Sequence, residues 1–281
     1  MAISLHPLTP TLGAELRGVD LAERLGDETV ATIRRALLDH HVVFLREQEI
    51  DAHQQIEFCK RFGPIMPSIG KRLGDRVDGV TVLDQIRPVG QGADEWHSDH
   101  MFSPNPPLGT VLYAVQLPRI GGDTCYVDMG AAYDALSPSM QRFLDELTAI
   151  NSNERTLARI DRTSLYENAQ ALARRGADRA THPLVRKHPD TGRKVLYASP
   201  RDTIRIHELS ERESERILSL LFAHLESPEL QCRFRWEPGS LAFWDNRAVQ
   251  HRAIPDYRER RIMHRTMIAE PGDGDRIPTS P

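Results

Sequence analysis

Short strand-like segments, separated by turn signals, recur along this 281-residue chain and constrain its fold more than any other feature. They are rich in β-branched and aromatic residues, and glycine, proline or aspartate stands between them. Such a chain must pair its strands into sheets and cover the sheets with its helices. The pattern therefore predicts a mainly β fold with flanking helices, of the sandwich or jelly-roll type. Strands are expected within residues 1–20 and at 41–45, 80–83, 110–117, 124–127, 184–187, 194–198, 231–236, 240–244 and 261–269.

Capping residues mark the clearest helix starts. Asp51 precedes one amphipathic segment, and Ser210 forms a capping box with Glu213 at the start of another. Helices are expected from Asp27, from Asp51 to about residue 63, at 137–148, at 163–175 and after Ser210. We expect a single domain over residues 1–281, with a mobile active-site loop at about 64–95, a helical insertion at about 130–180 and a frayed tail at 271–281.

The composition is that of a globular protein. Hydrophobic residues make up 40% of the chain and charged residues 27%, and no apolar run approaches the length of about 18 residues that a membrane span requires. The net charge of -4 argues against general nucleic-acid binding. The first residues lack the pattern of a secretion signal, and the 3 cysteines are odd in number. We therefore expect free, buried thiols in a reducing, cytoplasmic compartment.

His97 and Asp99 are the strongest candidates for metal ligands. Two residues apart on a β-strand, they would share one face with attachment points about 6.8 Å apart, so both side chains could reach one metal ion. A distant histidine would complete a 2-His-1-carboxylate face, which leaves coordination positions open and suits non-haem Fe(II). The same spacing occurs at His188 and Asp190, but a Thr-Gly pair follows there. We interpret those two residues as part of a hairpin turn.

Three blocks downstream of His97 add further chemistry. A Gly-Gly-Asp-Thr turn ends at Thr124, an FWDNR block is followed by His251, and the strand-like segment RRIMHR holds Arg261 and Arg265. By strand alternation the two arginines share one face of their strand. On that face they would either bind anions or form a solvated basic edge of the sheet.

Together these blocks resemble the taurine dioxygenase family of Fe(II)- and 2-oxoglutarate-dependent oxygenases, which also contains alkylsulfatases and aryloxyalkanoate herbicide dioxygenases. WHSD, GGDT, FWDNR with its following histidine, and RRIMHR occur in the family's order, and the match runs from about residue 3 to 269. The resemblance implies a single oxygenase domain with a double-stranded β-helix (jelly-roll) core. It also implies a homo-oligomer, either a dimer or a tetramer.

The resemblance further implies roles for individual residues. These are iron binding by His97, Asp99 and His251, binding of the far carboxylate of 2-oxoglutarate by Thr124 and Arg261, and binding of the substrate anion by Arg265. Iron, 2-oxoglutarate and O2 would then serve a dioxygenase that hydroxylates a C–H bond and releases succinate and CO2. The planar fork of an arginine suits a carboxylate, and a hydroxyl can complete such a site.

The sequence departs from the taurine enzymes near the expected substrate site. Those enzymes place a histidine and a tyrosine shortly after the RFG segment, whereas residues 64–71 contain neither. Residues 92–95 also lack the polar amide found there. These departures argue against taurine and favour another small organic anion, such as an alkyl sulfonate, an alkyl sulfate, or an aryloxy or alkyl carboxylate. Hydroxylation beside a sulfonate, sulfate or ether oxygen would give an unstable adduct and hence cleavage.

Two other classes of function stay open on the residues alone. A zinc hydrolase could use the same two histidines and carboxylate, since open zinc sites share that donor set. It would leave Thr124 and the paired arginines without a role. A non-catalytic jelly-roll protein could instead hold His97 and His251 as polar residues of its core and bind a small molecule.

Overall fold

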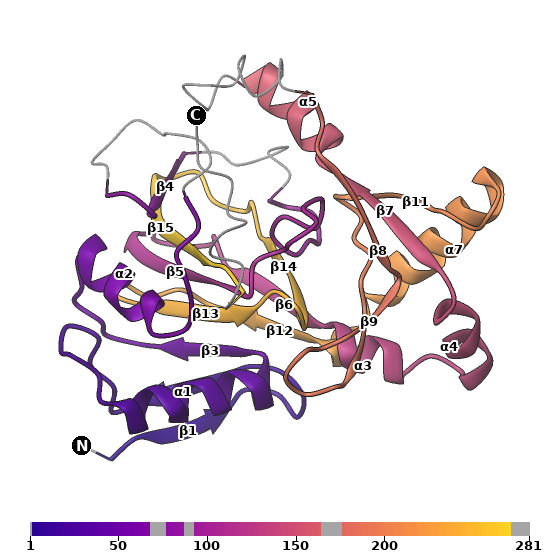
Figure 1. Cartoon of the computed structure of the whole chain (residues 1–281). Coiled ribbons are helices and arrows are strands. Elements are labelled where there is room, and N and C mark those ends of the chain that lie inside the picture. The colour runs from indigo at the N-terminus through magenta and orange to yellow at the C-terminus, as the bar shows by residue number, and fades with distance from the viewer. Residues whose placement is uncertain (1, 68–76, 87–92, 164–175, 271–281) are drawn as a thin grey trace.

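Two facing β-sheets form the centre of the protein (Figure 1). The computed structural model describes residues 2–67, 77–86, 93–163 and 176–270. Within these residues the larger sheet contains β1 (Ser4–Pro7), β2 (Ala14–Arg17), β3 (Val42–Leu45), β4 (Thr81–Gln85), β5 (Gly109–Gln116), β13 (Leu241–Asp245) and β15 (Arg261–Ile268). The strand order is β1-β2-β3-β13-β5-β15-β4. Only β2 and β3 pair in parallel among these described strands.

The second sheet packs against the first through a core of aromatic residues. It contains β6 (Thr124–Asp128) between β12 (Gln231–Phe234) and β14 (Val249–Ala253). Phe44 of β3 stacks on Phe234 of β12 with ring centroids 3.9 Å apart. Tyr126 of β6 meets Trp244 of β13 edge to face. Because each pair joins one sheet to the other, these contacts fix the distance between the two sheets.

Helices α1 (Asp27–His40) and α2 (Ala52–Lys60) cover the outer face of the larger sheet (Figure 1). The apolar stripe of α1 includes Ile33 and Leu37, which are buried in the same cluster as Phe243 of β13. Asp51 caps α2 with a complete capping box. The helical spacing of apolar residues read from the sequence thus becomes the face that packs on the sheet.

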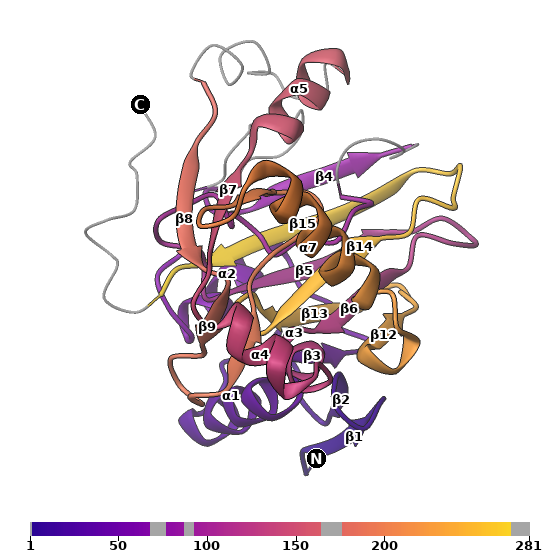
Figure 2. The same cartoon turned by 90° about the vertical axis from the view of Figure 1, so that its right-hand side faces the viewer.

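A third layer packs against the outer side of the second sheet, and Figure 2 shows one of its helices, α7 (Glu211–His224), in front of the central strands. Its helices are α3 (Met129–Asp134), α4 (Pro138–Leu144), α5 (Glu154–Thr163) and α7 (Glu211–His224), with a short 3-10 turn at Pro228–Leu230. Its strands are β7 (Thr148–Ser152), β8 (Arg179–Pro183) and β11 (Thr203–Ile206), which form one sheet, and the hairpin of β9 (Val185–Lys187) and β10 (Lys194–Leu196).

The mainly β architecture with outer helices confirms the coarse fold prediction, and the helices after Asp51 and Ser210 begin as predicted, both with capping boxes. Cys59, Cys125 and Cys232 are free and buried, as expected. Among the described helices, none combines the length and the apolar composition of a membrane span.

Three predictions about secondary structure are wrong. The helix expected at 137–148 ends at Leu144, and the chain then enters β7, because pairing with β8 and β11 outweighs local helix preference. The region 130–180 therefore contains strands as well as helices. The strand pattern also misses four strands, namely β7, β8, β11 and β14. The helix expected at 163–175 and the tail at 271–281 lie almost wholly outside the described residues, and the mobility of 64–95 stays a prediction.

The stacked pair between the sheets gives a test of the fold. Phe234→Ala removes a side chain that is 1% exposed and leaves Phe44 facing a cavity. We expect the free energy of unfolding to fall by about 3–5 kcal/mol in a chemical denaturation experiment. Phe143→Ala is the matched control, because Phe143 is 41% exposed and its truncation should change stability by no more than about 0.5 kcal/mol. Equal effects of the two variants would contradict the assigned core.

Candidate metal centre

The structure brings His97, Asp99 and His251 together in a buried cluster. Each side chain offers one ligand atom, and the three atoms lie within 4.8 Å of one another. That spacing allows all three to contact a single metal ion. Two imidazoles and one carboxylate match the donor set expected from the sequence, and three protein ligands leave further coordination positions open.

The segment that carries His97 and Asp99 is not a strand, which corrects the sequence prediction. His97 instead forms an isolated bridge with His251 of β14, in which each backbone N–H donates to the other residue's carbonyl oxygen at 3.1 and 2.8 Å. The Ser98 hydroxyl adds a 2.6 Å bond to the carbonyl oxygen of Val249. The chain then turns at Asp99. The bridge and the turn, rather than strand alternation, bring the ligands together.

Burial keeps both histidines neutral, which is the form that binds a metal. Desolvation lowers the pKa of His251 to about 4, and it lowers the pKa of His97 well below the ordinary value. Nδ1 of His97 lies 2.7 Å from the carbonyl oxygen of Glu95. A carbonyl oxygen can only accept a hydrogen bond, so this contact assigns the proton to Nδ1 and leaves Nε2 of His97 free to bind a metal.

Two residues missed by the sequence analysis position the Asp99 carboxylate. Thr110 Oγ1 donates to Asp99 Oδ2 at 2.7 Å, and Asn246 Nδ2 donates to Thr110 Oγ1 at 2.9 Å. Arg265 lies on another side, with Nη1 3.6 Å from Asp99 Oδ1. Burial alone would raise the pKa of Asp99, but His251, which is protonated at the low pH where Asp99 titrates, and Arg265 hold that pKa far below its usual range. The carboxylate therefore stays anionic. Asn246 belongs to the FWDNR block, whereas Thr110 carries no sequence signal.

Arg261 is a buried guanidinium whose hydrogen-bonding groups are not all used. It is 3% exposed, and its Nε and Nη2 have no hydrogen-bond partner among the described residues. Trp236 lies between it and Thr124: the guanidinium stands 5.8 Å from the Trp236 ring, and the indole N–H donates to Thr124 Oγ1 at 3.0 Å. Burial lowers the pKa of Arg261. A buried cation with free donors is costly, so the arrangement fits an anionic group such as a carboxylate.

Gly122 in the GGDT turn lies against the side chain of Arg261, where a larger residue would crowd it. A Cβ at Gly122 would lie 3.2 Å from Arg261 Cδ and from the Tyr257 ring, closer than most such contacts. Gly122 also has a φ of 79°, which favours glycine. The turn thus brings the backbone against the arginine just before Thr124 begins β6.

The second His-x-Asp pair is a hairpin turn, as predicted. Nδ1 of His188 accepts hydrogen bonds from the backbone N–H groups of Asp190 and Thr191, both at 3.2 Å. Nε2 of His188 lies 3.0 Å from Asp245 Oδ2, and Asp190 forms an ion pair with Arg247 at 2.8 Å. Both ring nitrogens of His188 are therefore occupied, and neither is available to a metal.

Known proteins with similar sequences decide the family. The family model described as "Taurine catabolism dioxygenase TauD, TfdA family" matches residues 4–267. The chain belongs to this family. It is 34% identical to an alpha-ketoglutarate-dependent sulfate ester dioxygenase of Pseudomonas putida, in an alignment covering 96% of this chain and 90% of that protein.

A second relative and a solved structure agree with the membership. This chain is also 34% identical to the alpha-ketoglutarate-dependent 2,4-dichlorophenoxyacetate dioxygenase of Cupriavidus pinatubonensis. The alignment covers 90% of this chain and 92% of that relative. The crystal structure of a taurine dioxygenase from Burkholderia xenovorans matches with a TM-score of 0.80 and 36% identity, covering 96% of this chain and 91% of the other. The resemblance found in the sequence is thereby confirmed.

Removing the carboxylate ligand tests the metal centre. We expect Asp99→Ala to bind Mn(II) or Fe(II) at least about 10- to 100-fold more weakly, because even residues that only support metal ligands contribute that much. Anaerobic calorimetry measures the affinity, and circular dichroism checks that the variant is folded. Asp190→Ala is the control from the other His-x-Asp pair and should bind metal like the wild type. Wild-type affinity in folded Asp99→Ala would exclude Asp99 as a ligand.

Proposed function

We propose that this protein is an Fe(II)- and 2-oxoglutarate-dependent dioxygenase that hydroxylates a C–H bond of a small organic anion. The observation that carries the proposal is the open His97, Asp99 and His251 cluster in a chain that also buries Arg261 with unused donors. Zinc hydrolysis would use the same three ligands but would leave that guanidinium without an anion. The two relatives described above support the proposal, because both are named alpha-ketoglutarate-dependent dioxygenases. Alpha-ketoglutarate is another name for 2-oxoglutarate.

The family match from residue 4 to 267 supports a single oxygenase domain, and the two facing sheets support a double-stranded β-helix core. The homo-oligomeric state and the cytoplasmic location expected from the sequence stay predictions. The net charge of -4 still argues against a nucleic-acid partner.

Each group in the site has a separate task in the proposed reaction. His97, Asp99 and His251 would hold the iron. Iron with 2-oxoglutarate and O2 supplies the oxidation, in which 2-oxoglutarate becomes succinate and CO2 and one oxygen atom enters a C–H bond of the substrate.

Arg261 would pair with the far carboxylate of 2-oxoglutarate, and the Thr124 hydroxyl would complete that site. Burial of both residues keeps water away from this ion pair. An ion pair shielded from water is stronger than an exposed one, so the cosubstrate would be held firmly at the end remote from the metal.

The balance of charge favours an anionic substrate. A metal dication, the Asp99 carboxylate and the 2-oxoglutarate dianion together carry one negative charge, whereas Arg261 and Arg265 carry two positive charges. One positive charge remains for the substrate to neutralise. Arg265 is the partly exposed member of the pair, and its Nε has no hydrogen-bond partner among the described residues. Its contact with Asp99 is long for an ion pair, so Arg265 remains available to a substrate anion.

The named substrates of the two relatives suggest the class of anion. One relative is named for sulfate esters and the other for an aryloxyacetate, and both compounds carry an anionic group close to a carbon bonded to oxygen. Hydroxylation of that carbon gives a hemiacetal-type adduct, which splits into a carbonyl compound and the oxygen-bearing leaving group. We infer the same outcome for an alkyl sulfate or an aryloxy carboxylate here. An alkyl sulfonate hydroxylated on the carbon bonded to sulfur would instead split into a carbonyl compound and sulfite.

A stoichiometry experiment tests the reaction class. The purified protein is supplied with Fe(II), O2 and 2-oxoglutarate, and hexyl sulfate, hexanesulfonate and phenoxyacetate are added one at a time. For the substrate that is used, we expect one succinate for each substrate molecule lost, and none without Fe(II). Consumption of substrate without 2-oxoglutarate would favour a hydrolase instead.

The cosubstrate site predicts the effect of Arg261→Ala. Removing one partner of a buried ion pair costs about 3–5 kcal/mol, so the affinity for 2-oxoglutarate should fall by about two to almost four decades. Thr124→Ala should lower it less, by about 1.5–3 kcal/mol for one hydrogen bond to a charged group. Arg260→Ala is the control, because Arg260 is exposed and pairs with Asp84. Unchanged affinity for 2-oxoglutarate in both Arg261→Ala and Thr124→Ala would place the cosubstrate elsewhere.

A substrate role predicts a different result for Arg265→Ala. We expect the KM of an anionic substrate to rise about 10- to 100-fold, as for a lost charged hydrogen bond, while slow succinate formation without substrate continues. The affinities for iron and 2-oxoglutarate should stay near those of the wild type. Loss of iron binding in this variant would show that Arg265 instead serves Asp99, which lies 3.6 Å away.

A further inference from the structure

Arg201 is a third arginine beside the metal ligands, and the proposed function gives it no role. It stands in the turn between β10 and β11. Its Nη2 donates to the carbonyl oxygen of Ser98, the residue between two of the ligands, at 3.4 Å. Its charge and that of Arg265 act on the same two ligands, Asp99 and His251. The guanidinium therefore lies at the metal pocket, although its backbone belongs to the outer layer.

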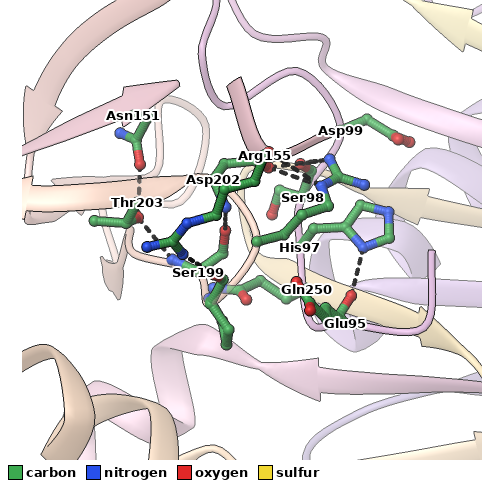
Figure 3. A network of polar contacts seen from close by, with 12 residues as sticks. Glu95, His97, Ser98, Asp99, Asn151, Arg155, Ser199, Asp202, Thr203 and Gln250 are labelled. Atoms are coloured by element: carbon green, nitrogen blue, oxygen red, sulfur yellow. Dashed lines mark hydrogen bonds and ion pairs between the residues drawn. The ribbon is translucent and has the colours of Figure 1, made fainter. Parts of the chain in front are cut away.

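Buried polar side chains hold the turn that carries Arg201 (Figure 3). The Ser199 hydroxyl accepts from the backbone N–H of Asp202 at 3.0 Å, and Thr203 Oγ1 accepts from the N–H of Ser199 at 2.9 Å. Thr203 Oγ1 in turn donates to Asn151 Oδ1 of β7 at 2.6 Å. All four side chains are buried. A buried network in which these groups satisfy one another makes the turn rigid, so the position of Arg201 is fixed.

Asp202 fixes the guanidinium of Arg201 as well. Arg201 Nε lies 3.1 Å from both carboxylate oxygens of Asp202, and Nη2 lies 3.0 Å from Oδ2. Nη1 of Arg201 forms no hydrogen bond with the described residues, and the side chain keeps 11% of its surface exposed. One end of the fork is thus occupied by Asp202 and Ser98, while the other end presents free N–H groups.

We propose that Arg201 is a specificity-determining residue that binds the anionic group of the substrate through Nη1, together with Arg265. The proposal rests on the function proposed above and adds a second donor to its substrate site. A sulfate, sulfonate or carboxylate has several oxygens and accepts hydrogen bonds from two guanidinium groups at once. Because Asp202 neutralises Arg201, Nη1 of Arg201 would orient the substrate anion without adding net charge to the pocket. The pocket therefore keeps its single positive charge for a monoanion.

The alternative is that Arg201 only neutralises the buried Asp202. The two cases differ in substrate binding when both charges of the pair are removed. The variant Arg201→Met/Asp202→Asn deletes the pair without leaving a lone buried charge. Arg201→Lys is a second variant, which keeps a cation beside Asp202 and so protects the fold. Lysine has a single ammonium group, so it cannot bind Asp202 as the arginine does and also reach the substrate anion. Arg205→Met is the matched control, because Arg205 is exposed on β11 and bonds to the carbonyl oxygen of Leu209.

Calorimetry without turnover tests the proposal. Each protein is loaded with Mn(II) and N-oxalylglycine, an unreactive analogue of 2-oxoglutarate, and titrated with hexyl sulfate, hexanesulfonate, phenoxyacetate and neutral hexanol. For any of the anions that the wild type binds, we expect about 10- to 100-fold weaker binding in the double variant, because one hydrogen bond to a charged group is lost. Arg201→Lys should show a smaller loss in the same direction. Arg205→Met, the binding of hexanol, and the affinities for Mn(II) and N-oxalylglycine should not change.

Two results would overturn the assignment of Arg201. One is wild-type affinity for the anions in the folded double variant or, where that variant fails to fold, in Arg201→Lys. The other is a wild-type protein that binds none of the three anions. Failure of the proposed function would be seen in a different experiment, as no succinate formed from 2-oxoglutarate by the wild type. The titrations need no turnover, so their results do not depend on that experiment.

Discussion

The backbone bridge between His97 and His251 is the contact on which the site depends. It joins two segments far apart in the sequence and brings two of the three candidate ligands together. The same strand that carries His251 pairs with β6, and the register places His251 opposite Tyr126, two residues beyond Thr124. The second sheet therefore positions both a candidate metal ligand and Thr124, which we propose completes the 2-oxoglutarate site, while β15 of the facing sheet supplies Arg261 and Arg265. The proposed chemistry lies between the two sheets.

The charges of the site are arranged for ligands that the protein itself does not provide. Both histidines are neutral, Asp99 is anionic, and Arg261 is buried with donors that no described residue uses. A fold would not gain stability from a buried cation left in this state. Its presence is explained when an anion enters with the metal. A different observation links Arg265 and Arg201 to an anionic substrate: each keeps N–H groups that no described residue uses. Positive groups from separate layers thus converge on one pocket.

The sequence predicts what is local and misses what depends on distant contacts. Capping boxes at Asp51 and Ser210 and the apolar strand patterns are contained within short segments, so those elements begin where expected. β14 could not be recognised, because its mixed residues gain their place from pairing with β6. Thr110 and Arg201 reach the metal pocket only through tertiary packing. His97 and Asp99 were expected to lie side by side and do so, although a bridge and a turn replace the expected strand; their role as metal ligands stays a prediction.

The central claim is that iron and 2-oxoglutarate share this site, and an anaerobic absorption spectrum tests it most directly. Chelation of Fe(II) by 2-oxoglutarate in a three-ligand site produces a weak charge-transfer band in the visible region. We expect the band to appear only when the protein, Fe(II) and 2-oxoglutarate are all present. No band at saturating iron and cosubstrate would contradict the account and would favour a zinc hydrolase or a simple binding protein.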